Sequence, residues 1–355
     1  MQIIFSPSEI IVTAAKPYVK MMVDSLTVEG QENMKYKEIP YVDKKVSRIF
    51  FGTAMEPFMR GEDCGALLDA VYEMGVNAFD SARAYGKAEQ SLGRWLAERS
   101  MRERVILLSK CAHPDLVTGQ KRVSEKDIRA DFEESSRCLN TDFIDIYLLH
   151  RDDPEVAAGE LIETFNAMHA EGKIGAFGGS NWTHERIEEA NEYAYKHNLI
   201  PFAVSSPNFG LAEQVGDPWG GGCVSVSGPQ GEAARRWYCE KQMPLIAYSS
   251  LAHGMFSGKV KSTDSEQIAE MLDEPAVRGY ACDANFERLR RCEELAAKKG
   301  CAVSQIAMAW IYGQDLNTFA VVSSTKPERM QSNIDALDIE LTQEELRYLD
   351  LSTST

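Results

Sequence analysis

The chain has 355 residues, of which 44% are hydrophobic and 26% are charged, a composition typical of one large globular domain or two smaller ones. Its formal net charge of -16 disfavours binding to nucleic acid or to an anionic membrane through a broad basic surface. The eight cysteines form no C-x-x-C pair, which argues against a zinc site and a disulfide framework, so we expect reduced thiols in a cytoplasmic protein without a metal.

The N-terminal residues 1–33 show no readable pattern. They contain short apolar pieces, but no basic start followed by an apolar stretch and a small-residue cleavage site, so we predict no signal peptide. Nowhere does an apolar run approach the roughly 20 residues that span a bilayer. We therefore expect an N-terminal extension of unassigned role over residues 1–33 and one domain over residues 34–355.

From Met34 onward the chain follows a regular pattern. Alternation over residues 36–42 and 45–49 predicts a hairpin. Short apolar runs then alternate with amphipathic helices. Strands are expected over residues 48–51, 76–79, 105–108, 143–149, 174–178, 202–204, 244–248 and 318–322. Helices are expected over residues 64–74, 88–99, 125–139, 155–171, from 183, 232–241, 286–299, 304–312, 327–337 and 342–349, and Ser124 is a predicted N-cap.

Eight strands that alternate with helices predict an α/β protein with a parallel sheet, closed into a (β/α)8 TIM barrel. An open doubly wound sheet is the competing fold, but no G-x-G-x-x-G follows the first strand, and polar residues end strands along the whole chain. Two of the connections between a predicted strand and the helix that follows it are unusually long. We call residues 212–231 the first long loop and residues 259–285 the second long loop, and expect both at the C-terminal face, around the active-site rim.

Four polar residues stand at the ends of neighbouring predicted strands: Asp80, Tyr85, Lys110 and His150. Closing the barrel would bring them together. Lys110 beside Tyr85 would lower the pKa of the phenol towards neutrality, and Asp80 would keep the lysine charged. His150 could orient a carbonyl by a hydrogen bond. Such a group of residues suits the reduction of a carbonyl, whose oxygen takes up a proton.

Each of these residues also has a structural explanation. Asp80 could be a helix cap, Tyr85 a packing residue and His150 a satisfied core histidine. Lys110 is harder to explain in this way, because burying an unpaired ammonium group is costly. The shared position of all four at strand ends favours the catalytic interpretation.

Several segments together resemble the aldo-keto reductases, in order from about residue 34 to the C-terminus. They are GVNAFDSARAYGKAEQSLGRWL, LLSK, IDIYLLHRDDP, GKIGAFGGSNW, IAYSSLAHGMFSGK and VVSSTKPERMQSNIDAL. The resemblance implies Tyr85 as general acid, Lys110 and Asp80 as the pair that tunes it, and His150 as the residue that orients the carbonyl. It also implies NADPH as the cofactor, extended across the barrel mouth without a Rossmann motif.

The resemblance further implies which residues contact the cofactor. Ser180 and Asn181 would hold the nicotinamide carboxamide and Tyr248 would stack on its ring. Ser206 stands where many members have Gln, and Ser323 where many have Lys, with Lys326 close by. The full implied set is Gly52, Thr53, Asp80, Ser180, Asn181, Ser206, Tyr248, Ser249, Leu251, Gly254, Lys259, Ser323, Thr325, Arg329 and Asn333.

Within this set, two groups have a phosphate-binding character. Ser249, Leu251, Gly254 and Lys259 resemble the loop that clasps the pyrophosphate. Hydroxyls from Ser323 and Thr325, together with the Arg329 guanidinium at a helix N-terminus, suit the 2'-phosphate of NADPH better than the bare ribose of NADH. Asn333 would contact the adenine.

Aromatic residues near the predicted rim are the candidates for substrate contact: Phe58, Trp182, Trp219 and His253. Their alternative role is to stabilise the long loops, and the sequence does not decide between the two roles.

The function that these residues predict is NADP-dependent reduction of an aldehyde, ketone or oxidised sugar, with a small molecule as partner and no indicated oligomeric state. One alternative is a non-catalytic NADP(H)-binding regulatory subunit, because the family includes potassium channel β subunits. Those subunits carry Asn in place of the histidine, so His150 favours an enzyme. Another alternative is a Schiff-base lyase with Lys110 as nucleophile, which would require a neutral lysine.

Overall fold

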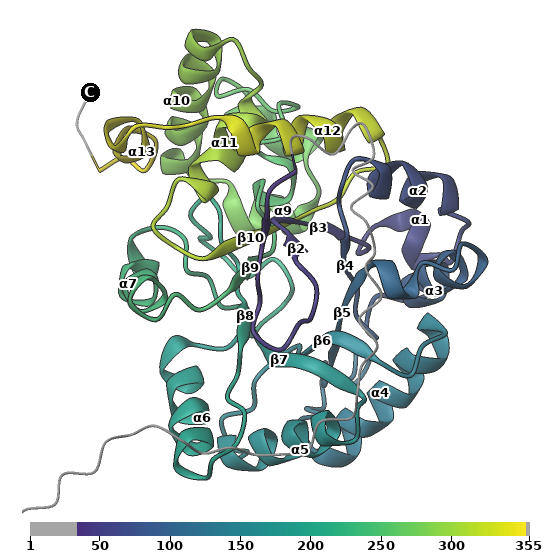
Figure 1. Ribbon diagram of the computed structural model, residues 1–355. Helices are drawn as coiled ribbons and strands as arrows, with labels where there is room; N and C mark the ends of the chain where they lie inside the picture. Colours follow the sequence, from purple (N-terminus) through teal and green to yellow (C-terminus); the bar gives the residue numbers. More distant parts are fainter. Residues whose placement is uncertain (1–33, 353–355) are drawn as a thin grey trace, which may run out of the picture.

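The structure is a computed structural model that describes residues 34–352 (Figure 1). Eight parallel strands close into a barrel in the order β10-β3-β4-β5-β6-β7-β8-β9, and helices surround it, so the predicted (β/α)8 fold is confirmed. The barrel strands are β3 (Ile49–Gly52), β4 (Ala78–Asp80), β5 (Ile106–Cys111), β6 (Ile144–Leu149), β7 (Ile174–Ser180), β8 (Val204–Ser206), β9 (Leu245–Ala247) and β10 (Thr318–Val322). The predicted extension over residues 1–33 lies outside the described residues.

The helices occupy the connections between these strands and the segment that follows β10. The α-helices are α1 (Glu56–Met59), α2 (Gly65–Glu73), α3 (Ala88–Glu98), α4 (Glu125–Leu139), α5 (Ala158–Ala170), α6 (His184–Lys196), α7 (Glu232–Lys241), α8 (Ile268–Met271), α9 (Glu274–Tyr280), α10 (Asp283–Lys299), α11 (Val303–Tyr312), α12 (Pro327–Asp335) and α13 (Gln343–Leu349). Short 3₁₀ helices cover Arg102–Arg104, Pro229–Gly231, Ala252–Gly254, Ser265–Gln267 and Ala336–Asp338. Among the helices of residues 34–352, none has the combination of length and apolar character needed to cross a membrane.

Most predicted elements are present, with shifted ends. The bounds of β10, α4 and α7 agree with the prediction, and Ser124 caps α4 by accepting a hydrogen bond from the Asp127 amide. Strand β8 begins two residues later than expected, and β7 continues to Ser180. Helix α3 begins at Ala88 as predicted, so Tyr85 lies in the turn before it.

The second long loop contains two short helices that the sequence prediction missed, α8 and α9. Helix α9 has a clear start signal, because Asp273 caps it by accepting a hydrogen bond from the Ala276 amide and Pro275 stands in its first turn. The long loops pack on each other. Arg278 Nε donates to the Asp217 carbonyl at 2.8 Å, and the Val215 amide donates to the Gly279 carbonyl at the same distance.

The predicted hairpin is confirmed as a short antiparallel pair, β1 (Tyr36–Lys37) and β2 (Val46–Ser47). It crosses the amino end of the barrel (Figure 1, purple). Ile39 and Val46 are buried there in one cluster with the inward-facing residues of the strands. The loop residue Lys44 pairs with Asp145 at 3.1 Å and donates to the Val105 carbonyl. The hairpin therefore plugs the end of the barrel opposite the predicted site.

The alternation along each strand explains how the barrel presents polar residues at its carboxyl end. Ile106 and Leu108 belong to the inner apolar cluster, and Lys110 is the next residue on the same face of β5. Along β6 the same series is Ile146, Leu148 and then His150. The inner layer of the barrel is thus apolar, and its last layer, at the carboxyl ends, carries the polar residues.

Candidate active site

The four residues predicted to act together meet at the carboxyl end of the barrel. Lys110 Nζ lies 2.5 Å from Asp80 Oδ1 and 3.3 Å from the Tyr85 hydroxyl, and it also donates to the Ser81 carbonyl at 3.0 Å. The rings of Tyr85 and His150 meet edge to face with centroids 5.5 Å apart. The parallel register of β4, β5 and β6 produces this arrangement, because it sets Asp80 opposite Leu108 and Lys110 opposite Leu148.

The Lys110–Asp80 pair is almost completely buried, with both side chains no more than 6% exposed. Burial by itself lowers the pKa of Lys110, but the charges of Asp80 and Tyr85 and the hydrogen bonds to them raise it above its ordinary value. The lysine is therefore a cation at neutral pH. A charged lysine is a poor nucleophile, which argues against the Schiff-base alternative.

The pKa of Tyr85 differs from the sequence-based expectation. Burial raises the pKa of the phenol above its ordinary value, and the positive charge of Lys110 only partly opposes this effect. The expected fall towards neutrality is therefore wrong for the free protein, because a sequence does not reveal how strongly a phenolate is desolvated. The phenol keeps its proton at neutral pH, which is the state that a proton donor requires.

His150 is a neutral imidazole in this environment. Burial lowers its pKa well below the usual range, and the positive charges of Lys110 and Arg151 act in the same direction. Its Nδ1 atom is buried and has no hydrogen-bond partner among the described residues. A neutral ring next to Tyr85 with an unused nitrogen can hydrogen-bond to a ligand.

Two residues at this site were not predicted. His113, three residues after Lys110, packs edge to face against His150 with ring centroids 4.8 Å apart. Arg151 directly follows His150, is 8% exposed, and donates from Nη1 to the His150 carbonyl at 2.9 Å. Each of the two residues lies just beyond the end of a predicted strand and within three residues of a predicted site residue. This position could have identified both from the sequence.

Part of the predicted nicotinamide site forms a connected group at the ends of β7, β8 and β9. Ser180 Oγ donates to the Ser206 carbonyl at 2.8 Å, and the Tyr248 hydroxyl donates to Asn181 Oδ1 at 2.7 Å. Asn181 Nδ2 also donates to the His150 carbonyl at 3.2 Å. A ligand amide group that binds here would have to replace some of these hydrogen bonds with its own. Ser206 Oγ is buried without a hydrogen-bond partner among the described residues, which fits a polar ligand group at this position.

Gly52, Thr53 and Ser323 lie together where β3 meets β10. Ser323 Oγ donates to the Gly52 carbonyl at 2.8 Å, and a Cβ on Gly52 would lie only 2.6 Å from Ser323 Oγ. Thr53 is fully buried, with its hydroxyl 3.0 Å from the Asp80 carbonyl and 2.9 Å from Ser81 Oγ. Thr53 thus fixes the end of β4, which carries Asp80.

The residues of the predicted pyrophosphate clasp follow β9 in a tight turn. Ser249 has a φ of 54° and Gly254 a φ of 101°, and Leu251 precedes the 3₁₀ helix Ala252–Gly254. Lys259 is exposed and its Nζ donates to the Met271 carbonyl of α8. The side chain of Lys259 therefore bonds within the second long loop, which it begins, and not to the turn that holds the other clasp residues.

The residues predicted to bind the 2'-phosphate and adenine surround the start of α12. Ser323, Thr325 and Arg329 are exposed, and Asn333 is buried one turn beyond Arg329. Within residues 34–352, Arg329 makes no ion pair with a carboxylate, whereas most arginines near the barrel do. An exposed guanidinium in the first turn of a helix is available to an anion.

The four predicted substrate-contact residues divide into two pairs. Phe58 and Trp182 are buried, at 0% and 1% exposure, and pack against Phe51 and Phe202 respectively. Both are core residues, so a role in packing fits them better than contact with a substrate at the rim. Trp219 is 46% exposed and meets the His253 ring edge to face at 5.1 Å. Trp219 and His253 therefore lie on the surface, beside the contact between the two long loops.

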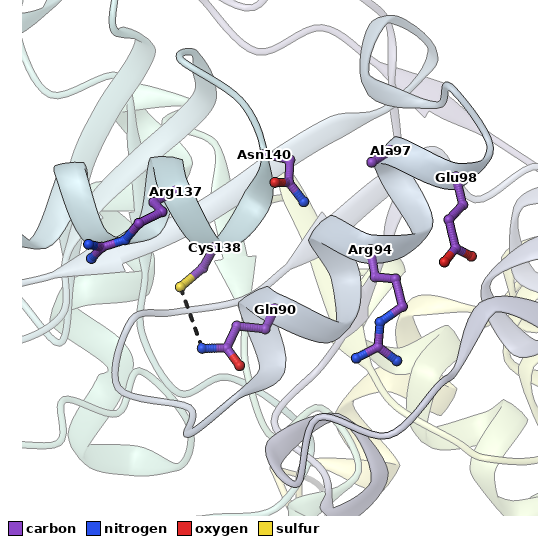
Figure 2. Close-up of a pocket in the computed structure, with 7 residues that line it drawn as sticks. All are labelled: Gln90, Arg94, Ala97, Glu98, Arg137, Cys138 and Asn140. Carbon is purple, nitrogen blue, oxygen red and sulfur yellow. Dashed lines mark hydrogen bonds between the residues drawn. The ribbon is translucent and has the colours of Figure 1, made fainter.

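A surface groove lies elsewhere, on the outside of the barrel between α3 and α4 (Figure 2). It is lined by Gln90, Arg94, Ala97, Glu98, Arg137, Cys138 and Asn140, with a weak contact of 3.9 Å between Gln90 Nε2 and Cys138 Sγ. None of the predicted site residues lines this groove, so it has no part in the chemistry above.

A buried carboxyl group supports the back of the site. Glu89 on α3 is 4% exposed, and Ser109 Oγ, next to Lys110 on the outer face of β5, donates to its Oε1 at 2.5 Å. Burial raises the pKa of Glu89 to about 7. Because this folded-state pKa lies above the unfolded value, the carboxyl group stabilises the fold fully below about pH 4.5 and loses that contribution as the pH rises towards 7.

The Glu89→Gln variant should therefore change the pH dependence of stability. At pH 8 we expect it to be more stable than the parent, by up to about 3 kcal/mol, while near pH 4.5 the two should differ little. Urea unfolding at both pH values measures the difference. If the difference were the same at both values, Glu89 would not titrate near neutrality in the folded protein.

Comparisons with known proteins agree with this geometry. The profile of the Aldo/keto reductase family matches residues 48–352. Aldo-keto reductase AFTS1 of Alternaria alternata is 27% identical over 315 residues, covering 80% of this chain and 80% of that protein. A probable aryl-alcohol dehydrogenase, AAD4 of Saccharomyces cerevisiae, is 26% identical over 321 residues, covering 82% and 88%. An uncharacterized oxidoreductase, YrpG of Bacillus subtilis, is 25% identical over 331 residues, covering 89% and 95%. The chain therefore belongs to the aldo/keto reductase family and is an oxidoreductase.

Proposed function

We propose that the protein is an NADPH-dependent reductase of an aldehyde, a ketone or an oxidised sugar, with residues 34–355 as its catalytic domain and the cytoplasm as its place of action. The observation that carries the proposal is the position of Lys110 Nζ, within hydrogen-bond distance of both Asp80 and the Tyr85 hydroxyl. The names of several relatives, including aryl-alcohol dehydrogenase, favour aromatic aldehydes as the first substrates to test.

In this function Tyr85 is the general acid. Its phenol carries a proton at neutral pH, and the Lys110 ammonium stabilises the phenolate left after the proton is transferred to the carbonyl oxygen. Asp80 holds the lysine charged and in place. Neutral His150 orients the carbonyl by a hydrogen bond. The nicotinamide cofactor supplies the hydride when it is bound.

The residues that would hold the cofactor are those around Ser206, Asn181 and Tyr248 for the nicotinamide, and those around Arg329 for the 2'-phosphate. The Ser206 hydroxyl and the Arg329 guanidinium support this assignment, because among residues 34–352 the first has no hydrogen-bond partner and the second makes no ion pair. The regulatory-subunit alternative would use the same residues without turnover. The presence of a histidine at position 150 supports the enzyme.

The test is a titration with NADPH and NADH, followed by nucleotide fluorescence, and then a panel of aromatic aldehydes, ketones and oxidised sugars. We expect tight NADPH binding and oxidation of NADPH with at least one carbonyl compound. Tight binding without turnover of any compound would favour the regulatory subunit, and the absence of nucleotide binding would refute both functions.

The Arg329→Ala variant tests the cofactor preference. We expect NADPH affinity to fall by about 10- to 100-fold, because a charge-assisted contact with the 2'-phosphate is lost, and NADH affinity to change by less than about threefold. Dissociation constants from fluorescence titration measure both effects. Equal losses for the two nucleotides would contradict a role in recognising the 2'-phosphate.

A further inference from the structure

Among residues 34–352 the buried cation Arg151 has no acidic partner, unlike Lys110, Arg83 and Arg122 at the same end of the barrel. Lys110 pairs with Asp80, and both Arg83 and Arg122 pair with Asp131. The two aspartates that follow Arg151 in the chain are also occupied, because Asp152 pairs with Arg186 and Asp153 with Lys121. Within residues 34–352, no carboxylate lies within 4.0 Å of the Arg151 guanidinium.

Two contacts hold Arg151. Its Nη1 donates to the His150 carbonyl at 2.9 Å, and its Nη2 lies 3.8 Å from Cys223 Sγ of the first long loop. At 8% exposure the guanidinium is largely desolvated, and a buried charge without a counter-charge is unfavourable. The described contacts leave several of its five N–H donors for another acceptor.

The surroundings of Arg151 are those of the reacting groups. Burial is the largest influence on the pKa values of Tyr85, His150 and His113, and the positive charge of Arg151 contributes a lowering of each. The same charge also contributes a lowering of the pKa values of Tyr248 and Cys223. Arg151 Nη1 and Asn181 Nδ2 donate to the same His150 carbonyl, so the guanidinium lies beside the predicted nicotinamide site. On its other side it contacts Cys223 of the first long loop.

The first long loop meets Arg151 through Gly222 and the side chain of Cys223. Residues 220–222 are three consecutive glycines with positive φ angles of 83°, 131° and 76°. A Cβ on Gly222 would lie 3.3 Å from Arg151 Cδ and 3.6 Å from Nε. The nearest acid of the loop, Asp217, accepts hydrogen bonds from the amides of Trp219 and Cys223. Gly222 thus lets the loop approach the arginine closely, and no carboxylate of residues 212–231 pairs with the guanidinium.

From these observations we infer that Arg151 binds an anionic group of the substrate, so that the preferred carbonyl compound carries a carboxylate or a similar compact anion. This inference rests on the proposed function. The cation would orient the substrate so that its carbonyl faces Tyr85 and His150, and it would attract anions to a protein whose net charge of -16 otherwise repels them.

The test compares 4-carboxybenzaldehyde with its methyl ester, methyl 4-formylbenzoate, which has similar reactivity and no charge. We expect the parent to prefer the carboxylate. Arg151→Gln should lower the carboxylate-to-ester ratio of kcat/KM by about 10- to 100-fold, mainly through KM, as for the loss of a charge-assisted hydrogen bond. Arg151→Lys should keep the ratio within about fivefold to tenfold of the parent, because the positive charge remains.

Lys121→Gln is the matched control, because it removes one positive charge from an exposed position at the same end of the barrel. It should leave the ratio unchanged. If Arg151→Gln reduced kcat/KM equally for both aldehydes, Arg151 would only support the backbone at His150 and the inference would be wrong.

A binding measurement separates this inference from the proposed function. Calorimetric titration with benzoate should show binding to the parent and much weaker binding to Arg151→Gln, whether or not aldehydes are reduced. If the parent reduced no aldehyde with either nucleotide, the proposed function would fail, and benzoate binding alone would decide the anion site. Benzoate binding that is absent, or equal in parent and variant, would refute the anion site.

Discussion

Replacing Tyr85 with Phe should reduce kcat for carbonyl reduction by about 10²- to 10⁴-fold, the contribution typical of a positioned general acid. The substitution deletes the proton donor and removes little volume. The aromatic ring stays available to pack against His150 at 5.5 Å, so the fold should be preserved. NADPH affinity should change little, because the hydroxyl's neighbour in the free protein is Lys110.

Steady-state kinetics and fluorescence titration of Tyr85→Phe measure turnover and cofactor binding separately. Tyr195→Phe on α6 is the control, since Tyr195 is 65% exposed and far from the site in the fold. Turnover that remained at the parental level in Tyr85→Phe would refute the assignment of the general acid.

The second large effect concerns the buried ion pair. Lys110→Met leaves Asp80 buried at 4% exposure without its counter-charge, so we expect a loss of about 3–5 kcal/mol in the free energy of unfolding. Turnover should fall as well, because the phenolate of Tyr85 loses its stabilising cation. Unfolding by urea and steady-state kinetics measure the two losses independently.

A double variant separates stability from catalysis. Asp80→Asn combined with Lys110→Met removes both charges, so most of the lost stability should return while turnover stays low. If the double variant regained turnover, the pair would act only by stabilising the fold. If Lys110→Met were as stable as the parent, the ion pair would make no net contribution to stability, as expected if the buried Asp80 takes up a proton once its counter-charge is removed.

The fold and the four central residues could be predicted because both follow from alternation. A residue two positions beyond a buried inward-facing one lies on the same face of its strand, which is how Ile106 and Leu108 place Lys110. Barrel closure then brings the ends of β4, β5 and β6 together. None of this needs knowledge of side-chain packing.

The points that the sequence left open or predicted wrongly concern properties that depend on the surroundings of a side chain. The exposure of Phe58 and Trp182 depends on neighbours distant in sequence, such as Phe202, and both are core residues. The pKa of Tyr85 depends on the balance between desolvation and the charge of Lys110. The sequence does not single out Arg151, because which cations of residues 34–352 pair with a carboxylate can be identified only once the chain is folded.

The closure of the barrel also bears on how the chain folds as it is synthesised. Strand β3 pairs with β10, and Arg48 next to β3 bonds to Thr318 across 270 residues. Until β10 has left the ribosome, β3 and β9 each have an unpaired edge, and such edges pair readily with other chains. The first barrel strand, β3, can therefore pair on both edges only after nearly the whole chain has been synthesised. Until β10 is inserted, we expect the nascent protein to need protection from aggregation.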